Sequence, residues 1–207
     1  MSACCDGGCA LDAQRARQRA TLMWVLGINA VMFVVIVVAA IYGDSSALLA
    51  DSLDNLGDAL TYGLSLYAVS RGARTKAQVA LFKGGLILLA ACTVAAQIVY
   101  RFFHPHLPLF EVMGVFSLLG LAANGVCLLL LSRHRHEDVN MSSVWECSRN
   151  DIVSNVSVFV AAGAVWVTAS AWPDLLVALG LVVFLMRSAL RVLASAWREL
   201  RATGQHT

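Results

Sequence analysis

The sequence predicts an all-α, polytopic membrane protein with six transmembrane helices. Of its 207 residues, 59% are apolar and only 14% are charged, whereas about 45–50% of the residues of a soluble domain are apolar. Six apolar runs approach or exceed the roughly 20 residues with which a helix spans the hydrocarbon core of a bilayer. They lack the alternating polarity of membrane-barrel strands, which are about 9–11 residues long. We expect helices at 21–42, 46–70, 77–103, 109–132, 143–169 and 174–196.

Each run has features that support a span. The first run lacks the small-residue cleavage site of a signal peptide, so we expect it to remain in the membrane. The second and fifth runs carry polar residues but keep the length of a span. The third holds Lys83 in its first half, where a long side chain can reach toward water. The fourth and sixth also have the required length, and the sixth opens at Asp174.

The basic residues predict the orientation of these helices. Short cytoplasmic loops are enriched in Lys and Arg, and here basic residues flank the same ends of the runs: Arg15, Arg17, Arg19, Arg71, Arg74, Lys76, Arg133, Arg135, Arg191, Arg198 and Arg201. Both termini should therefore face the cytoplasm. The net charge of +2 is then a signal of orientation, and we expect no nucleic-acid partner.

We divide the chain into three parts on this basis. Residues 1–20 form a cytoplasmic tail that contains cysteines, residues 21–196 form the six-helix transmembrane domain, and residues 197–207 form a short cytoplasmic C-terminal tail. The expected location is a cell membrane, a bacterial inner membrane, with a multi-pass topology.

Two pairs of polar residues inside the runs predict a metal site. Asp54 and Asp58 in the second run are four residues apart, as are Cys147 and Asp151 in the fifth. Residues with this spacing lie on one face of a helix, one turn apart. Two such pairs on facing helices can supply four tetrahedral ligands, the coordination that zinc prefers. An acid inside a bilayer is costly and usually marks a functional site.

Other interpretations of these residues stay open. Cys147 could be a packed thiol, and Lys83 could neutralise one of the acids. Asp51, three residues before Asp54, could be a fifth metal ligand or could line an outer vestibule.

The remaining cysteines fall into two groups. Cys4, Cys5 and Cys9 lie close together on a Gly-containing tail, and three thiols on a flexible segment can bind one soft ion. A disordered tail without a role is the alternative. In the reducing cytoplasm we expect no structural disulfide there. Cys92 and Cys127 lie in apolar runs, where a small buried residue is the simpler interpretation.

The charge of the predicted site suggests how it works. Three carboxylates and a thiolate exceed the charge of a divalent ion, so the empty site should bind protons. Metal ligands bind in the deprotonated form, so metal must displace those protons. Competition between metal and protons for one site is what an exchange of one for the other requires.

These residues resemble the cation diffusion facilitators, a family of six-span exchangers of divalent metal for protons. The stretch 45–58, SSALLADSLDNLGD, is similar to the signature of the family's second helix, which implies ligand roles for Asp54 and Asp58. The fifth-helix signature, His followed four residues later by Asp, corresponds to Cys147 and Asp151. The resemblance covers about residues 21–196 and includes the stretch from Asp174 that opens the sixth run and the stretch 188–191 near its end.

Two departures from the family affect the expected function. Cys147 stands where the family usually has histidine, and a thiolate favours soft ions, so cadmium becomes a candidate beside zinc. The chain also ends soon after the last run, so we expect it to lack the cytoplasmic domain with which members bind metal and dimerise. A homodimer remains open.

We therefore expect a divalent metal transporter that exports zinc or a related soft ion, such as cadmium or cobalt, in exchange for protons. It would not be an enzyme and would need no cofactor besides the transported ion, and its partners would be the metal, protons and the lipid bilayer. The alternatives are a membrane thiol oxidoreductase and a metal sensor or buffer that does not transport.

Overall fold

Six α-helices make up the regular secondary structure in the described part of the chain. The structure, a computed structural model, describes the backbone of residues 3–68, 73–132 and 139–204. Side chains are described for residues 17, 19–64, 66, 78, 80–132, 151–198, 200 and 201. The helices are α1 Ala3–Tyr42, α2 Ser46–Ala68, α3 Ala73–Phe103, α4 Phe110–Ser132, α5 Val139–Thr168 and α6 Trp172–Gly204. The all-α prediction is confirmed.

Five of these helices are long and apolar enough to cross a membrane, over Arg19–Tyr42, Ala80–Phe103, Phe110–Ser132, Asp151–Thr168 and Trp172–Arg198. Within the described residues, α2 is the helix that does not meet this criterion. It is 23 residues long, but it carries Asp51, Asp54 and Asp58. The described part of the predicted run, Ser46–Ala68, therefore does form a helix, and it is the least suited of the six to contact lipid.

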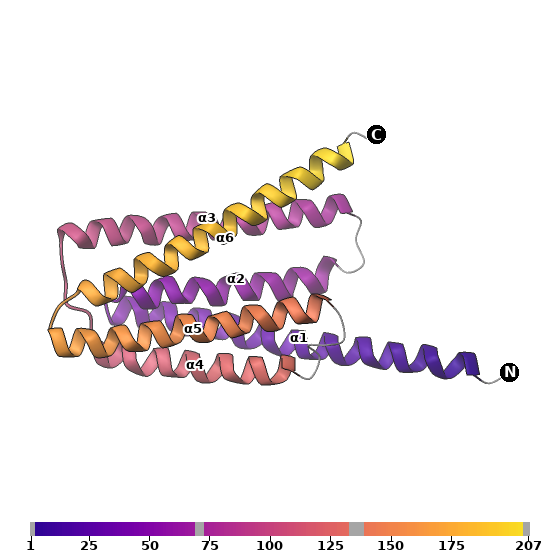
Figure 1. Cartoon of the computed structure of the whole chain (residues 1–207), viewed down its shortest axis with the longest axis horizontal. Helices are drawn as coiled ribbons and strands as arrows, with labels where there is room; N and C mark the ends of the chain where they lie inside the picture. The colour runs from indigo at the N-terminus through magenta and orange to yellow at the C-terminus, as the bar shows by residue number, and fades with distance from the viewer. Residues whose placement is uncertain (1–2, 69–72, 133–138, 205–207) are drawn as a thin grey trace.

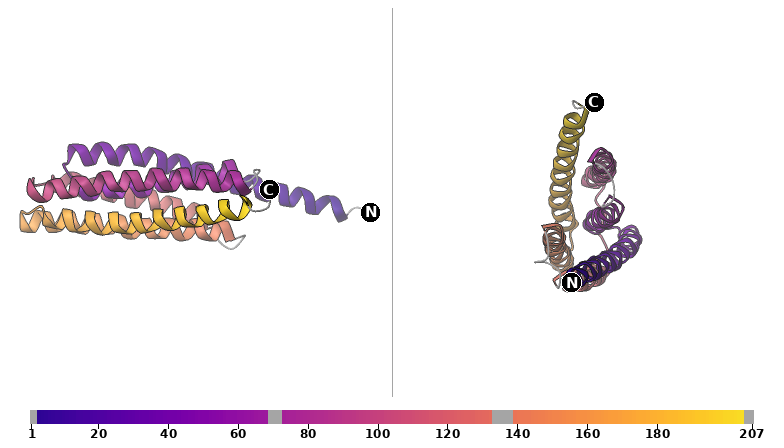
Figure 2. Two further views of the ribbon diagram at one scale, coloured as in Figure 1. Left: turned by 90° about the horizontal axis from the view of Figure 1, so that it is seen from above. Right: turned by 90° about the vertical axis from the view of Figure 1, so that its right-hand side faces the viewer.

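The position of α2 explains how it tolerates these acids. It contacts each of the other five helices, whereas α3 packs mainly on α6 and α4 mainly on α5. Figure 1 shows α3 and α6 on one side of α2, and α4 and α5 on the other. The end-on view in Figure 2 shows the same arrangement. The helix that carries Asp51, Asp54 and Asp58 thus lies at the centre of the bundle, where the other helices surround it.

Four helices extend beyond the predicted spans: α3 and α5 begin four residues earlier, and α1 and α6 extend the furthest. α1 includes most of the predicted N-terminal tail, and α6 continues through residue 204. Both extensions contain Ala, Leu and Arg, which favour helix. The two termini lie at the same end of the bundle, and the short connections at 43–45, 104–109 and 169–171 lie at the other.

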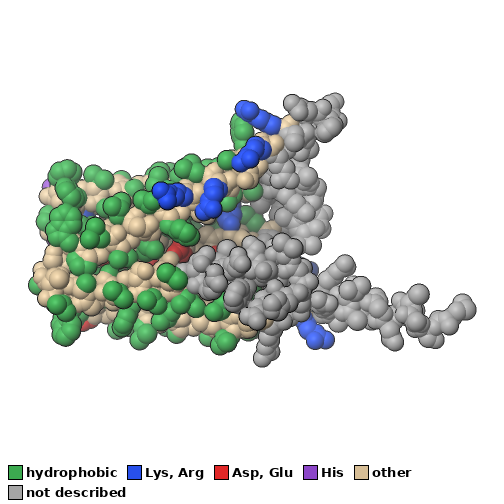
Figure 3. Space-filling model, viewed as in Figure 1, with side chains coloured by type: hydrophobic (Ala, Val, Ile, Leu, Met, Phe, Trp, Pro, Cys, Tyr) green, Lys and Arg blue, Asp and Glu red, His purple; other side chains and the backbone are tan. Residues whose placement is uncertain are grey.

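The outward faces of the helices are apolar. Phe82 and Leu129 are each 70% exposed, and Val167 is 76% exposed. Figure 3 shows such hydrophobic side chains spread over much of the bundle. A soluble monomer rarely exposes contiguous apolar patches of this extent. Together with the length of the helices, this surface identifies a multi-pass membrane protein.

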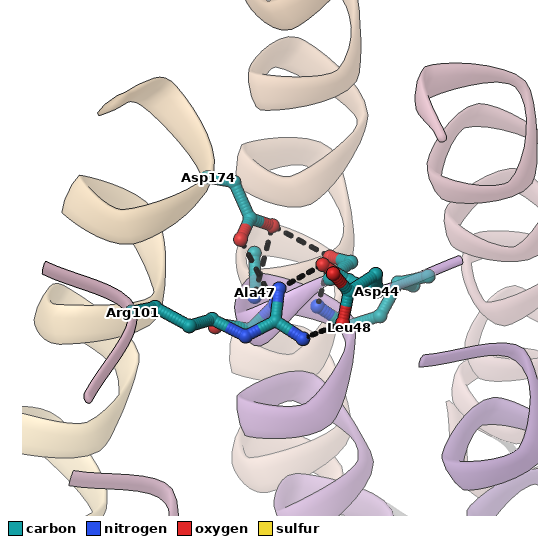
Figure 4. Close-up of polar contacts among 7 residues, drawn as sticks. Asp44, Ala47, Leu48, Arg101 and Asp174 are labelled. Carbon is teal, nitrogen blue, oxygen red and sulfur yellow. Dashed lines mark hydrogen bonds and ion pairs between the residues drawn. The ribbon is translucent and has the colours of Figure 1, made fainter. Parts of the chain in front are cut away.

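A buried carboxylate at the connection end joins α6 to the start of α2 (Figure 4). Asp174 accepts hydrogen bonds from the Ser45 hydroxyl at 2.6 Å and from the backbone N–H groups of Ser46 and Ala47 at 2.9 and 3.0 Å. The Ser45 hydroxyl in turn accepts from the Leu48 N–H at 3.1 Å. The first N–H groups of a helix have no partners within the helix, so Asp174 acts as an N-terminal cap from another helix.

An ion pair between Arg101 and Asp44 also connects helices at this end of the bundle. Arg101, near the end of α3, is buried and donates to both the carboxylate and the backbone carbonyl of Asp44. Asp44 has a φ of 53°, in the left-handed region that aspartate enters more readily than most residues. The turn between α1 and α2 is thereby held by α3 as well as by α6.

Asp174→Ala should lower the free energy of unfolding by about 2–4 kcal/mol, because three buried donors would lose a charged acceptor. The measurement is denaturation of the purified protein in detergent. Arg198→Ala, which changes an exposed side chain on the same helix, is the control and should have little effect. Equal stability of the two variants would contradict the capping role of Asp174.

Candidate metal centre

A cavity of about 320 Å³ lies between α2, α3, α5 and α6. Its lining includes Asp54 and Asp58 from α2 and Asp151 from α5. Each of these side chains is 9% exposed. Figure 3 shows acidic side chains in the hollow between α5 and α6. The structure therefore brings three of the four predicted metal ligands to one cavity.

Local spacing explains why these acids converge. Asp54, Asp58 and Tyr62 follow one another at four-residue intervals along α2, so they share one face of the helix. The Tyr62 hydroxyl donates a hydrogen bond to the Asp58 carboxylate. Tyr62 was not among the predicted site residues, although the same four-residue spacing could have identified it.

The three acids do not have equivalent contacts. The carboxyl groups of Asp58 and Asp151 lie within hydrogen-bonding distance of each other across the α2–α5 contact. Asp54 instead contacts the side chain of Ser154, one turn along α5 from Asp151. A hydrogen bond between two carboxyl groups requires a proton on one of them. Asp58 and Asp151 thus form a pair of carboxyl groups, and Asp54 is separate from it.

The carboxyl groups of Asp54, Asp58 and Asp151 are not arranged as a metal coordination sphere in this structure. Among the side chains that the structure describes, no group of three or more His, Cys, Asp or Glu residues could hold a metal ion. Asp58 and Asp151 meet, but Asp54 is turned toward Ser154. Position 147 lies on α5, one turn before Asp151, and the Cys147 side chain lies outside the described residues. Its predicted ligand role stays a prediction.

Two basic residues also line the cavity. Lys83 of α3 donates a hydrogen bond to the Thr61 hydroxyl of α2. Arg191 of α6 is also among the residues that line the cavity. The sequence placed Lys83 in a span but gave no indication that Arg191 would line the same cavity as the acids. The lining of the cavity thus contains basic side chains as well as acidic ones.

Asp51, predicted to be a fifth ligand or to line an outer vestibule, lies on α2 one turn before Asp54. It is completely buried, and neither carboxylate oxygen has a hydrogen-bond partner in the described structure. The described residues that line the cavity do not include it. Asn155 on α5 also has an unpartnered side-chain oxygen and packs against Gly120, where an added Cβ would lie 2.1 Å from that oxygen.

The remaining cysteines give no support to a second site within the described residues. Cys127 is buried and Cys92 is exposed, and the Asn29 amide contacts the Cys127 sulfur at 3.8 Å. The predicted accessory ligands lie on α1 with side chains outside the described part of the structure: Cys4, Cys5 and Cys9.

Comparison with known proteins places these observations in a family. The model of the cation efflux transmembrane domain matches residues 22–201. The zinc transporter ZitB of Yersinia pestis is 27% identical over 173 residues, which cover 75% of this chain and 54% of that protein. ZitB of Yersinia pseudotuberculosis matches with the same identity and coverage. The chain spans about half the length of these curated relatives. It belongs to the cation efflux family, the cation diffusion facilitators.

Proposed function

We propose that the protein exports a divalent metal cation from the cytoplasm in exchange for protons. The observation that carries this proposal is the convergence of Asp54, Asp58 and Asp151 on one cavity in the middle of the bundle. Acids within a membrane domain usually mark an ion pathway. A site at the interface of two groups of helices suits alternating access, in which the groups rock around the bound ion.

The metal would be bound by Asp54, Asp58 and Asp151 together with Cys147. Rotation of the Asp54 side chain away from Ser154 would bring a third carboxylate to the Asp58–Asp151 pair. Zinc fits carboxylate and thiolate ligands, and the similarity to proteins named as zinc transporters supports it. The thiol at position 147 makes cadmium or cobalt a second candidate.

Proton exchange follows from the chemistry of the Asp58–Asp151 pair. The two carboxyl groups can share a proton in the absence of metal, but both must be deprotonated to bind a cation. Each arriving ion would therefore release a proton, and each departing ion would leave a site that takes one up. Exchange across the membrane requires only that the two events occur on opposite sides.

The proposed orientation has both termini in the cytoplasm of a bacterial inner membrane. The termini lie at one end of the bundle (Figure 1), and Arg17, Arg198 and Arg201 lie toward that end. Basic residues are enriched on the cytoplasmic side. The curated relatives are bacterial. Assembly as a homodimer is part of the proposal.

Flux measurements test the proposal. The purified protein in lipid vesicles should take up zinc or cadmium when a pH gradient is imposed, and a protonophore should abolish the effect. Competition between the two metals in the same vesicles would identify the preferred ion. A thiol oxidoreductase would move no metal, and a sensor or buffer would bind metal without moving it. Flux that ignores the pH gradient would contradict proton exchange.

A further inference from the structure

A lysine lies inside one of the helices that are apolar enough to span the membrane. Lys83 is in the segment Ala80–Phe103 of α3, where an unpaired charge would be costly. Its ammonium group donates to the Thr61 hydroxyl on α2. Thr61 is three residues beyond Asp58, about one helical turn, and Lys83 interacts electrostatically with that acid. The lysine is thus directed toward the carboxylates and away from lipid.

α3 packs closely on α6 beside this lysine. A Cβ added to Gly84 would lie 2.9 Å from Leu193 Cγ and 3.5 Å from the Ala189 carbonyl oxygen. The absence of a side chain at Gly84 therefore lets α6 pack closely beside Lys83. With α6 on one side and α2 on the other, Lys83 lines the same cavity as the three acids.

Acidic side chains outnumber basic ones in the described lining of this cavity. Within the described residues the lining contains three carboxyl groups, Lys83 and Arg191. Arg191 is exposed, and its Nε donates to the Arg187 carbonyl at 3.4 Å. Of these two cations, Lys83 is the one that interacts electrostatically with Asp58. A divalent ion bound by Asp58 and Asp151 would have the same sign of charge as the nearby ammonium, so the two cations must oppose each other.

We propose that Lys83 is a tethered counter-cation of the metal site, which compensates the carboxylates while no metal is bound and competes with the incoming ion. This inference rests on the proposed function, because it presupposes that the acids bind metal. Its consequence is a lower metal affinity than the same ligands would have without the lysine. A carrier gains from this, because an ion that is bound too tightly leaves slowly.

Metal titration of the full-length protein in detergent tests the inference, with zinc and cadmium as the probes. Lys83→Met removes the charge but keeps an unbranched side chain, and should tighten binding by on the order of tenfold. Lys83→Arg keeps the charge and should bind as the wild type does. Arg198→Met removes an exposed cation that does not line the cavity and should change nothing.

The possible results are distinguishable. A residue with only a structural role would weaken binding when replaced, so tighter binding by Lys83→Met would support the competition. If the wild type binds metal and Lys83→Met binds it equally well or more weakly, the role proposed for Lys83 is wrong, but the proposed function is not affected. Absence of binding by the wild type would overturn the proposed function as well. Lys83→Gln, also neutral, provides the same measurement if the Met variant fails to fold.

Discussion

Asp58→Ala and Asp151→Ala should each reduce metal flux by about a hundredfold or more. These two carboxyl groups meet in the central cavity, and each substitution removes one ligand from a site in which solvent cannot easily replace it. The same substitution also removes half of the pair that would share a proton. Both binding and coupling should therefore fail. The measurement is zinc or cadmium uptake into vesicles under an imposed pH gradient.

The control for this experiment is an acid outside the cavity. Glu111 lies in the first turn of α4, is exposed, and does not line the cavity. Glu111→Ala should transport as the wild type does. All three variants should remain folded, which their thermal unfolding in detergent would report. Full flux in either cavity variant would rule out that carboxylate as an essential ligand.

Much of the fold could be predicted from the sequence because bilayer thickness constrains the length of apolar helices. The predicted run at 109–132 and the observed helix Phe110–Ser132 differ by a single residue at the start. The four-residue spacing likewise predicted that Asp54 and Asp58 would share a face, which is a property of any helix. These predictions depend on local periodicity alone.

The remaining features depend on which helices meet, and local periodicity does not encode that. Hydropathy could not show that α2 is central and contacts all five other helices. It could not show that Asp174 would cap α2 from another helix, or that Arg191 would line the cavity. Asp51 has the same residue type as Asp54 and lies one turn away, yet it is not among the described residues that line the cavity. Whether the side chain of Asp51 reaches the cavity depends on how α2 packs against its neighbouring helices.

The metal affinity should decrease as the pH is lowered. If each metal ion displaces one proton, the affinity should fall about tenfold per pH unit, and each further displaced proton adds another factor of ten. The sign follows from the site. At lower pH a proton occupies the Asp58–Asp151 pair more completely, and the metal must remove it to reach both carboxylates. At higher pH, once the pair has lost its proton, the affinity should become independent of pH.

Calorimetry can measure the displaced protons directly. The purified protein is titrated with zinc in buffers that differ in ionisation enthalpy, because the buffer absorbs each proton that the metal displaces. The apparent binding enthalpy should change with the buffer by an amount that corresponds to at least one proton per metal. Glu111→Ala should show the same dependence. Identical enthalpies in all buffers would mean that no proton leaves. In that case Asp58 and Asp151 could still bind a metal ion, but this site could not couple metal to protons.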